Sequence, residues 1–450
     1  MKRWPIVGIL AWALLAAAPA YAGKIYLMGG GYDDANVDLF VNGLRKATGR
    51  DSSYTPDLNS TSNCSSNWAT TACPRIAVVT SSKESYAVGL DAFENDLDNG
   101  DGTVKRSYYN LFQTHGFSPR FITVHVDNYG SHAYSGNSAG DANIAIVNQA
   151  DVVWFAGGDQ ARIARSWLRN DGNDTPLAAA LRARWNANSP GFVVGGDSAG
   201  NHAMNSLMHG GGISYGYLYY RADLPTLSVP QFASFGDTRD GLTALRYFEN
   251  GAKLKGLSFL PAHLLSDTHF DARSGRLGRL LAAMRSMGRQ QGFGVDEDTG
   301  LLVDTDSHTA RVFGSGPVII ADLSAATYPS GSYWKVSGAR VSLLTAGDSY
   351  NYSTQLISSS KSLIGTRYYS GYYDSADVFS AFETSRVLTR VVDQSASYNL
   401  GAAPAPDYSS APYYPASAPT ITLRFTRDAS SKGYYSAGRY TVAKVKLDIY

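Results

Sequence analysis

The sequence predicts an α/β protein, with a mostly parallel sheet flanked by helices and a Tyr-rich, strand-rich C-terminal extension. Short apolar and β-branched runs alternate with helix-like segments through the first two thirds of the 450-residue chain. After about residue 325, Tyr, Ser and Gly become more frequent and strand-like runs predominate. We therefore expect a main domain at 23–350 and an extension of unknown role at 351–450.

The elements of the main domain follow one another as strand and helix. The strand-like runs are Lys24–Met28, Arg75–Thr80, Phe121–Val126, Asp151–Ala156 and Gly191–Val194. The helix-like segments are Tyr86–Leu97, Thr103–Gly116, Ala139–Gln149 and Pro176–Ala187. Beyond residue 325, strands are expected at Ala339–Leu344, Ile421–Thr426 and Arg439–Ile449, with a helix at Asp377–Val392.

Gly-rich turns follow three of the expected strands. They lie at Gly29–Gly31, Gly157-Gly158 and Gly195-Gly196. Because ligands bind beyond the carboxyl ends of the strands in such sheets, we expect the functional site at these turns.

Charge and the first residues limit the function classes. With Lys+Arg 39 against Asp+Glu 38, the chain lacks the basic excess that non-specific nucleic-acid binding needs. Lys2 and Arg3 precede an apolar run, Ile6–Ala18, and the small-residue site Ala20–Ala22, so residues 1–22 are predicted to be a cleaved secretory signal peptide. No later segment is long and apolar enough to span a bilayer. We expect an exported protein, secreted or periplasmic, without membrane contact after signal cleavage.

Cys64 and Cys73 are the two cysteines of the chain, within a stretch rich in Ser, Asn and Thr. In an exported protein, a local disulfide between them is expected. Two Cys without a neighbouring His make a poor zinc site. No metal ligand set and no organic cofactor is expected either, because the chain has no HExxH, no P-loop and no strand–GxGxxG–helix unit.

Two serines lie in a G-x-S-x-G pattern, which is typical of a tight strand-to-helix turn that exposes a nucleophile. Ser198, in Gly196–Gly200, follows an apolar run and precedes a helix-like segment. Ser138, in Gly136–Gly140, follows a polar loop and is interpreted as a helix N-cap residue. Ser198 is therefore the candidate nucleophile.

A serine nucleophile needs a base, and several histidines compete for that role. His202 is too close in sequence to reach back over the turn, and His125 lies within an expected strand. His209 precedes three glycines as in a lipase oxyanion loop, but it follows the serine instead of preceding it. His269 lies where an apolar strand, Leu257–Leu265, gives way to an Arg-rich helix. From the residues alone, the choice stays open.

Four ordered motifs resemble a known family. Val153–Gln160 is similar to the GGDQ signature of cyanophycinases, a serine peptidase family that also contains dipeptidase E. The Gly195–Gly200 turn, Asp267–Arg279 with its DxHFxxR start, and Gly294–Thr299 follow in the family's order. A looser match runs from Lys24 to about Asp348. The resemblance is to the extracellular type and implies a class I glutamine amidotransferase-like fold.

The resemblance also implies roles for individual residues. Ser198 would be the nucleophile, His269 the general base and Glu297 the acid that orients the base. The backbone N–H groups of Ala199 and Gly158 would form the oxyanion hole. The third member of the triad stays open, since Asp296 is adjacent to Glu297, and Asp237 or Asp240 could serve instead.

Cyanophycin is multi-L-arginyl-poly-L-aspartate, so its repeats present both carboxylates and guanidinium groups. The resemblance implies that Gln160 lines the substrate pocket and that Asp267 accepts a substrate guanidinium. Carboxylates would be bound by Arg273, Arg276 and Arg279, the last of these on the far side of a helix from its apolar stripe. Two departures from the family pattern affect these contacts: an extra residue precedes Arg276, and Thr268 replaces a Gln.

These expectations combine into one function. The chain would be an exported serine exopeptidase that hydrolyses cyanophycin to β-Asp-Arg dipeptides. Two alternatives stay open: a dipeptidase acting on Asp-containing peptides, or a non-catalytic protein whose Tyr-rich C-terminal region binds a polymer. The sequence is compatible with a homodimer but does not predict an oligomeric state.

Overall fold

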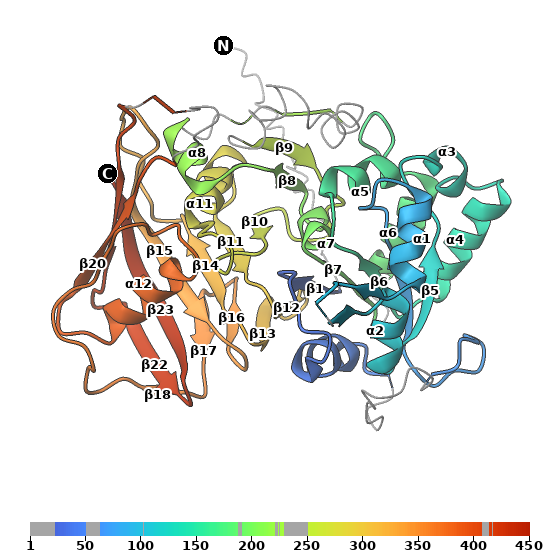
Figure 1. Ribbon diagram of the computed structural model, residues 1–450, viewed down its shortest axis with the longest axis horizontal. Helices are drawn as coiled ribbons and strands as arrows, with labels where there is room; N and C mark the ends of the chain where they lie inside the picture. Colours follow the sequence, from blue (N-terminus) through green and yellow to red (C-terminus); the bar gives the residue numbers. More distant parts are fainter. Residues whose placement is uncertain are drawn as a thin grey trace, which may run out of the picture.

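Two large β-sheets form the framework of the protein in the computed structural model (Figure 1). The structure describes residues 23–50, 64–101, 103–187, 191–220, 224, 226–228, 251–406, 414–415 and 417–450. The predicted signal peptide at 1–22 and the acids Asp237 and Asp240 lie outside these residues. Within the described ranges, none of the helices has the length and apolar character that crossing a bilayer requires.

The first sheet is mixed, with strand order β17-β16-β13-β12-β1-β7-β6-β2-β5. Its parallel strands are β1 (Lys24–Met28), β2 (Arg75–Val79), β5 (Ser118–Ile122), β6 (Val152–Phe155) and β7 (Val193–Asp197). Its antiparallel strands are β12 (Thr299–Asp304), β13 (Thr309–Gly314), β16 (Ser349–Asn351) and β17 (Leu356–Ser358). A mostly parallel sheet was expected. The antiparallel part arises because β12 and β13 are joined by a short turn instead of a crossover helix.

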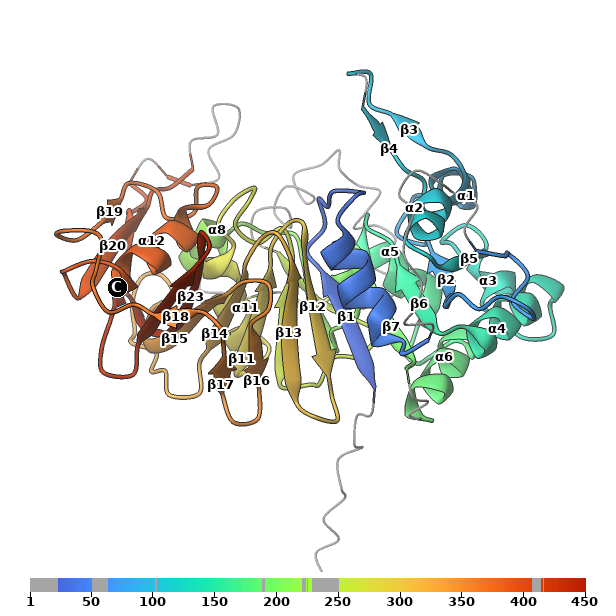
Figure 2. The same ribbon diagram turned by 90° about the horizontal axis from the view of Figure 1, so that it is seen from below.

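Helices cover both faces of the first sheet. Successive side chains of β1 point to opposite faces and all four apolar ones are buried, so both faces must be covered. Ile25 and Leu27 pack into a core beneath helices on one face, whereas Tyr26 and Met28 pack into a core on the other. The first group of helices is α3 (Tyr129–His132), α4 (Ser138–Gln149), α5 (Gln160–Trp167), α6 (Pro176–Asn186) and α7 (Ala199–Ala203). The second is the π-helix η1 (Asp38–Arg45), α1 (Tyr86–Glu94) and α2 (Tyr108–Thr114), and Figure 2 shows η1 lying across β1.

The second sheet is mostly antiparallel, in the order β10-β11-β14-β15-β23-β21-β20-β19 with β22 and β18 beside β23. Its strands are β10 (Leu264–Asp267), β11 (Gln291–Val295), β14 (Val318–Asp322), β15 (Val336–Leu344), β18 (Ser362–Leu363), β19 (Asp374–Ser375), β20 (Tyr398–Ala403), β21 (Ile421–Thr426), β22 (Lys432–Ser436) and β23 (Arg439–Ile449). A separate core joins this sheet to α8 (Ser214–Tyr219), α11 (Leu277–Ser286) and α12 (Glu383–Val392). Two antiparallel strand pairs, the hairpin β3–β4 (Leu97–Asp98, Val104–Lys105) and the pair β8–β9 (Leu207–Gly210, Ala252–Lys255), are separate from both sheets.

The predicted boundary at residue 350 does not separate two cores. β23, near the end of the chain, lies between β15 and β21 in the second sheet, and β17 extends the first sheet. The extension therefore completes both sheets. Its strands close a sheet whose first members carry part of the candidate site.

Two predicted elements differ from the structure for local reasons. The strand expected at Phe121–Val126 ends at Ile122, because Asn143 and Asn128 side chains accept the N–H groups of Thr123 and His125. The helix expected at 103–116 starts only at Tyr108, with Ser107 as its N-cap, because Val104-Lys105 pair in the β3–β4 hairpin. In contrast, β1, β21 and β23 have the predicted bounds.

Candidate active site

Ser198 lies at the tip of a tight turn between β7 and α7. Its φ of 50° and ψ of −111° are unusual for a residue with a side chain. A Cβ atom at Gly196 or Gly200 would lie 2.3 Å or 1.9 Å from the carbonyl oxygen of Phe155 in β6. Both glycines of the motif are therefore needed for the turn to approach the neighbouring strand. Ser198 is fixed further by its N–H, which donates to the Met28 carbonyl oxygen at 3.1 Å.

His269 and Glu297 reach Ser198 from the second sheet. They follow the parallel neighbours β10 and β11. The Nε2 atom of His269 is 2.8 Å from Ser198 Oγ, and its Nδ1 atom is 2.6 Å from Glu297 Oε1. With Nδ1–H donating to the carboxylate, Nε2 accepts the hydroxyl proton of the serine. The site thus lies where the two sheets meet.

The glycine turn after β1 covers the histidine and the acid. A Cβ atom at Gly30 would lie 2.5 Å from His269 Cε1, and one at Gly31 would lie 2.5 Å from the Glu297 carboxyl carbon. The Gly29 carbonyl oxygen also accepts the backbone N–H of His269 at 3.0 Å. This turn was expected at the site, and its glycines leave room for the two side chains.

His269 is neutral over a wide pH range. Its burial lowers the pKa to about 4; the cations of Arg276 and Arg273 act in the same direction, and the hydrogen bond to Glu297 opposes them. The pKa of Glu297 is lowered, because hydrogen bonds from His269 and Arg273 outweigh its partial burial. At neutral pH the pair is therefore a neutral imidazole beside a carboxylate, the state in which a general base accepts a proton.

The turn at Gly157-Gly158 faces the serine. The Gly157 N–H donates to Asp197 Oδ2 at 3.1 Å and to the Tyr108 hydroxyl at 3.3 Å. Gly158 has a φ of +150° and lies against Ser82. Since the Gly157 amide is engaged, the Gly158 N–H is the one of the two that can face an oxyanion, together with Ala199 at the start of α7.

Asp197, which precedes the nucleophile, was not predicted as a site residue. It is buried, and besides the Gly157 N–H it accepts the indole N–H of Trp154 at 3.1 Å. Burial raises its pKa, while Lys105 and Lys83 oppose the shift. Its position inside the G-x-S-x-G motif was the signal available in the sequence. Its contacts hold the glycine turn against the elbow.

The predicted substrate-binding residues occupy different places. Arg273 is exposed beside Ser198, and its Nε donates to Glu297 at 2.5 Å. Gln160 instead donates to the His209 carbonyl oxygen at 3.1 Å. Arg276 donates to the Thr268 carbonyl oxygen at 2.7 Å and is largely buried. Of these three side chains, only that of Arg273 lines the pocket that opens at Ser198.

Asp267 and Arg279 form a buried ion pair, which corrects their assignment as substrate contacts. Asp267 is fully buried, and Arg279 donates to both of its carboxylate oxygens. The remaining Arg279 Nη1 donates to the Gly212 carbonyl oxygen. Arg279 was expected on the far side of its helix, but α11 is buried on this side too because α8 packs against it. The pair joins β10 to α11.

Asp267 also belongs to a buried cluster with His202 and His209, in which the possible ligand atoms lie within 4.8 Å of one another. Such a set could bind a metal ion in isolation. Here Arg279 already binds the carboxylate, and a second guanidinium, that of Arg276, lies 3.7 Å from it. These positive charges oppose a bound cation.

A hollow of about 600 Å³ opens at Ser198. Its walls include Lys83 and Lys105, and the second of these lies on the β3–β4 hairpin, which projects from the molecule in Figure 2. Sequence reasoning missed both lysines, since Lys105 was assigned to a helix and Lys83 belongs to none of the motifs. The other lining residues are Gly30–Asp34, Asn99, Val104, Tyr108, Gly157, Gly158, Asp197, His269 and Arg273. The hollow therefore offers three cations to a ligand.

A serine on a strand–turn–helix elbow, hydrogen-bonded to a histidine that a carboxylate orients, is the arrangement of serine hydrolases with a triad. The chain is similar in sequence to several named proteins. The chain is 28% identical to the cyanophycinase of Synechococcus elongatus over 221 residues, which are 48% of this chain and 56% of that protein. It is 28% identical to the cyanophycinase of Geminocystis herdmanii over 216 residues, 46% of this chain and 65% of that protein. The chain is a homologue of the cyanophycinases.

The chain spans little more than half the length of the first of these relatives. No family model matches it. Among solved structures, the crystal structure of a peptidase from an acI-B1 Actinobacterium aligns with a TM-score of 0.39 and 13% identity, over 74% of this chain and 98% of that one. At that score the structure adds nothing to the assignment.

Proposed function

We propose that the protein is an exported serine peptidase that hydrolyses cyanophycin to β-Asp-Arg dipeptides. The observation that carries the proposal is the hydrogen-bonded chain Ser198 Oγ–His269 Nε2 and His269 Nδ1–Glu297 Oε1, at 2.8 Å and 2.6 Å. The relatives named cyanophycinase support the substrate class. The basic, apolar start of the chain supports export.

In the first half of the reaction, Ser198 Oγ attacks the carbonyl carbon of the scissile amide. Its proton passes to His269 Nε2, and the imidazolium is stabilised by Glu297. The oxyanion faces the N–H groups of Ala199 and Gly158. The C–N bond then breaks, the proton on Nε2 passes to the leaving amine, and an ester to Ser198 remains.

In the second half, a water molecule replaces the amine. His269 takes one proton of the water as its oxygen attacks the ester carbonyl carbon. The bond to Ser198 Oγ breaks, and the proton returns to the serine. The products are a free carboxylate, an amine and the unchanged enzyme, so one water is consumed for each amide hydrolysed.

The charge of the hollow suits a substrate with carboxylates. Lys83, Lys105 and Arg273 line it beside the serine. Asp33 and Asp34 line it as well and can accept a guanidinium. A repeat that carries both groups is matched by walls of both signs. A peptide with Asp alone would use the three cations and leave these acids unpaired.

The test is to add the purified protein and its Ser198→Ala variant separately to insoluble cyanophycin and to Asp-containing dipeptides. We expect polymer clearing and β-Asp-Arg release by the wild type, and a loss of about 10⁴-fold or more in the variant. Hydrolysis of dipeptides without polymer clearing would favour the dipeptidase. Polymer binding without any hydrolysis would favour the non-catalytic protein, and activity that survives the substitution would refute the mechanism.

A further inference from the structure

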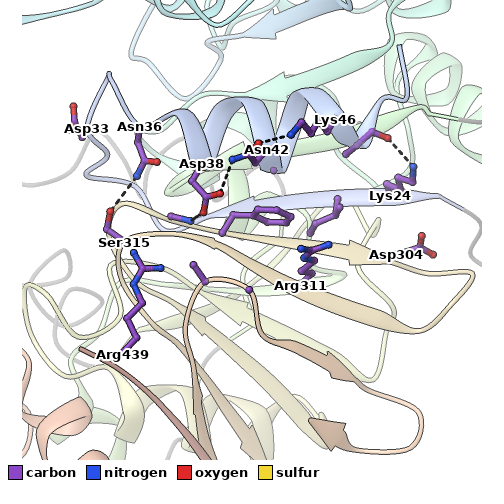
Figure 3. A pocket seen from close by; sticks show the side chains of 17 residues that line it. Lys24, Asp33, Asn36, Asp38, Asn42, Lys46, Asp304, Arg311, Ser315 and Arg439 are labelled. Atoms are coloured by element: carbon purple, nitrogen blue, oxygen red, sulfur yellow. Dashed lines mark hydrogen bonds between the residues drawn. The ribbon is translucent and has the colours of Figure 1, made fainter. Parts of the chain in front are cut away.

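A second hollow, of about 980 Å³, is drawn with its lining residues in Figure 3. Its walls come from β1, η1, β12 and β13, together with the turn at Ala346-Gly347 and with Arg439 at the start of β23. Asp33 lines both hollows, so they meet at the turn that follows β1. We call the second hollow the η1 groove. Its volume is at the upper end of the range for small-molecule sites, which leaves room for several residues of a chain.

Four cations line the η1 groove: Lys24, Lys46, Arg311 and Arg439. Within the described part of the chain, none of them has a carboxylate partner within 4.0 Å. Lys24 donates to the Ala47 carbonyl oxygen, and Lys46 donates to Asn42 Oδ1. The two arginines are exposed, and within the same described residues neither guanidinium donates a hydrogen bond. In Figure 3 the guanidinium of Arg439 points toward Ser315, and Arg311 lies on β13.

Each acid of the groove accepts at least one hydrogen bond from a backbone N–H group of the protein. Asp38 Oδ2 accepts the Gly314 N–H at 2.8 Å, and Asp304 Oδ1 accepts two N–H groups of the turn after β12 at 3.0 Å. Asp33 Oδ1 accepts the Ala35 N–H at 2.9 Å. These acids keep their charge, and the groove has four cations against three carboxylates. Arg311 and Arg439 keep their N–H donors for a ligand, so they are the groups of the groove that can bind its carboxylates.

We propose that the η1 groove binds a second stretch of the polymer whose end is cleaved at Ser198, with Arg311 and Arg439 holding its carboxylates. This inference rests on the proposed function, since it concerns the same substrate chain. A polymer with one free carboxylate per repeat can bind two spaced guanidinium groups at once, and each additional contact is then intramolecular. Arg439 belongs to the C-terminal extension, so the groove gives that extension a part in substrate binding.

The test measures binding without turnover, in the Ser198→Ala background. Arg311→Gln with Arg439→Gln is compared with Arg169→Gln, an exposed arginine that lines neither hollow. Co-sedimentation with cyanophycin granules is expected to weaken at least tenfold in the double variant, since charge-assisted hydrogen bonds are lost at two sites. The Arg169→Gln control should bind the granules as tightly as the parent protein does, and its binding should weaken with added salt to the same degree. Equal binding by the two proteins would overturn the proposal.

A second measurement uses the active serine. The ratio of kcat/KM for the polymer to kcat/KM for a two-repeat substrate is expected to fall about tenfold in the double variant relative to the Arg169 control. A ratio equal to that of the control would also overturn the proposal. Failure of the proposed function has a different signature, because the wild type would then release no dipeptide from either substrate.

Discussion

Glu297 determines which nitrogen of His269 carries the proton. Because its Oε1 atom is 2.6 Å from Nδ1, the proton is held there and Nε2 faces the serine. Glu297→Gln is expected to lower kcat by about 10²–10⁴-fold, since an amide favours the wrong tautomer and cannot stabilise an imidazolium. Steady-state kinetics on short β-Asp-Arg substrates would measure the loss.

The matched variant for this test is Asp296→Asn, which addresses the alternative that the sequence left open. Asp296 Oδ1 accepts the N–H groups of Asp271, Ala272 and Glu297, so it holds the turn instead of the imidazole. An Asn at this position keeps an oxygen acceptor, and a much smaller loss of kcat is expected. A larger loss in Asp296→Asn than in Glu297→Gln would exchange the two roles.

The low pKa of His269 predicts activity in acid. A general base works only when neutral, so kcat/KM should rise with pH through about 4 and stay level up to neutrality. Arg273→Gln removes a cation that lowers this pKa, so the acid limb should move to higher pH. A pH profile of kcat/KM for the wild type and for Arg273→Gln measures the pH of the acid limb in each protein. An acid limb near pH 6.5 in the wild type, or a shift to lower pH in the variant, would contradict it.

Part of the site could be predicted at the residue scale. Ser198, His269 and Glu297 were assigned from ordered motifs, and the structure brings their side chains together. The pairing of Asp267 with Arg279 was missed, because periodicity indicates a helix face but not which side chain of a neighbouring element, here Asp267 of β10, lies against that face. Lys83 and Lys105 were missed for a related reason, as their approach to the site depends on tertiary packing.

At the scale of single elements, the turn after β1 requires a particular residue type, glycine, at position 30. Gly30 has a φ of +91°, and a Cβ atom there would overlap the imidazole of His269. Gly30→Ala is expected to lower kcat by at least about 10²-fold, because a small displacement of a catalytic group has effects of that size. The same substitution at Gly49, which has a φ of +64° and no atom within 4 Å of its Cβ position, is the control.

The control separates backbone strain from contact. Both substitutions place a side chain at positive φ, so both should lower the melting temperature, and Gly30→Ala should lower it further because of the overlap with His269. Only Gly30→Ala should lower kcat in addition. If the two variants lost activity equally, strain rather than contact with His269 would be the cause.

Strands and helices with a regular pattern were predicted well at this scale, and turns were not. β21 and β23 alternate apolar and polar residues and have the expected bounds. The apolar run at 257–265 was expected to be one strand, but only its last residues enter β10. Its earlier backbone N–H groups instead donate to carbonyl oxygens of residues 203–205 near α7. The apolar pattern of a short segment does not show that its N–H groups have partners some fifty residues earlier in the chain.

For the molecule as a whole, the extension is part of the fold. β23 lies between β15 and β21, and its apolar residues Val442, Val445 and Leu447 are buried in the core of the second sheet. A chain that ends at residue 350 would leave β15 as an exposed edge over an open core. We expect such a truncation to be insoluble or unfolded, as measured by soluble yield and circular dichroism. A folded 23–350 fragment with the melting temperature of the full chain would contradict this.

The extension also contacts the loop that carries Arg273. The Phe382 N–H donates to the Asp271 carbonyl oxygen at 2.7 Å, and the Ser385 N–H donates to the Asp271 carboxylate at 2.8 Å. Gly275 in turn donates to the Phe379 carbonyl oxygen at 2.7 Å. The segment before α12 therefore supports the loop between His269 and α11. This contact between the C-terminal extension and the loop that carries Arg273 was not predicted from the sequence.

The origin of Ser198 and Glu297 in different sheets has a consequence for when the candidate site forms. Ser198 follows β7 in the first sheet, whereas Glu297 follows β11, which is joined through β14 and β15 to β23 near the end of the chain. The serine gains its base only when the two sheets have docked. A chain whose last strands are not yet in place is therefore expected to lack the hydrogen bond between Ser198 and His269, so the candidate site forms late in folding.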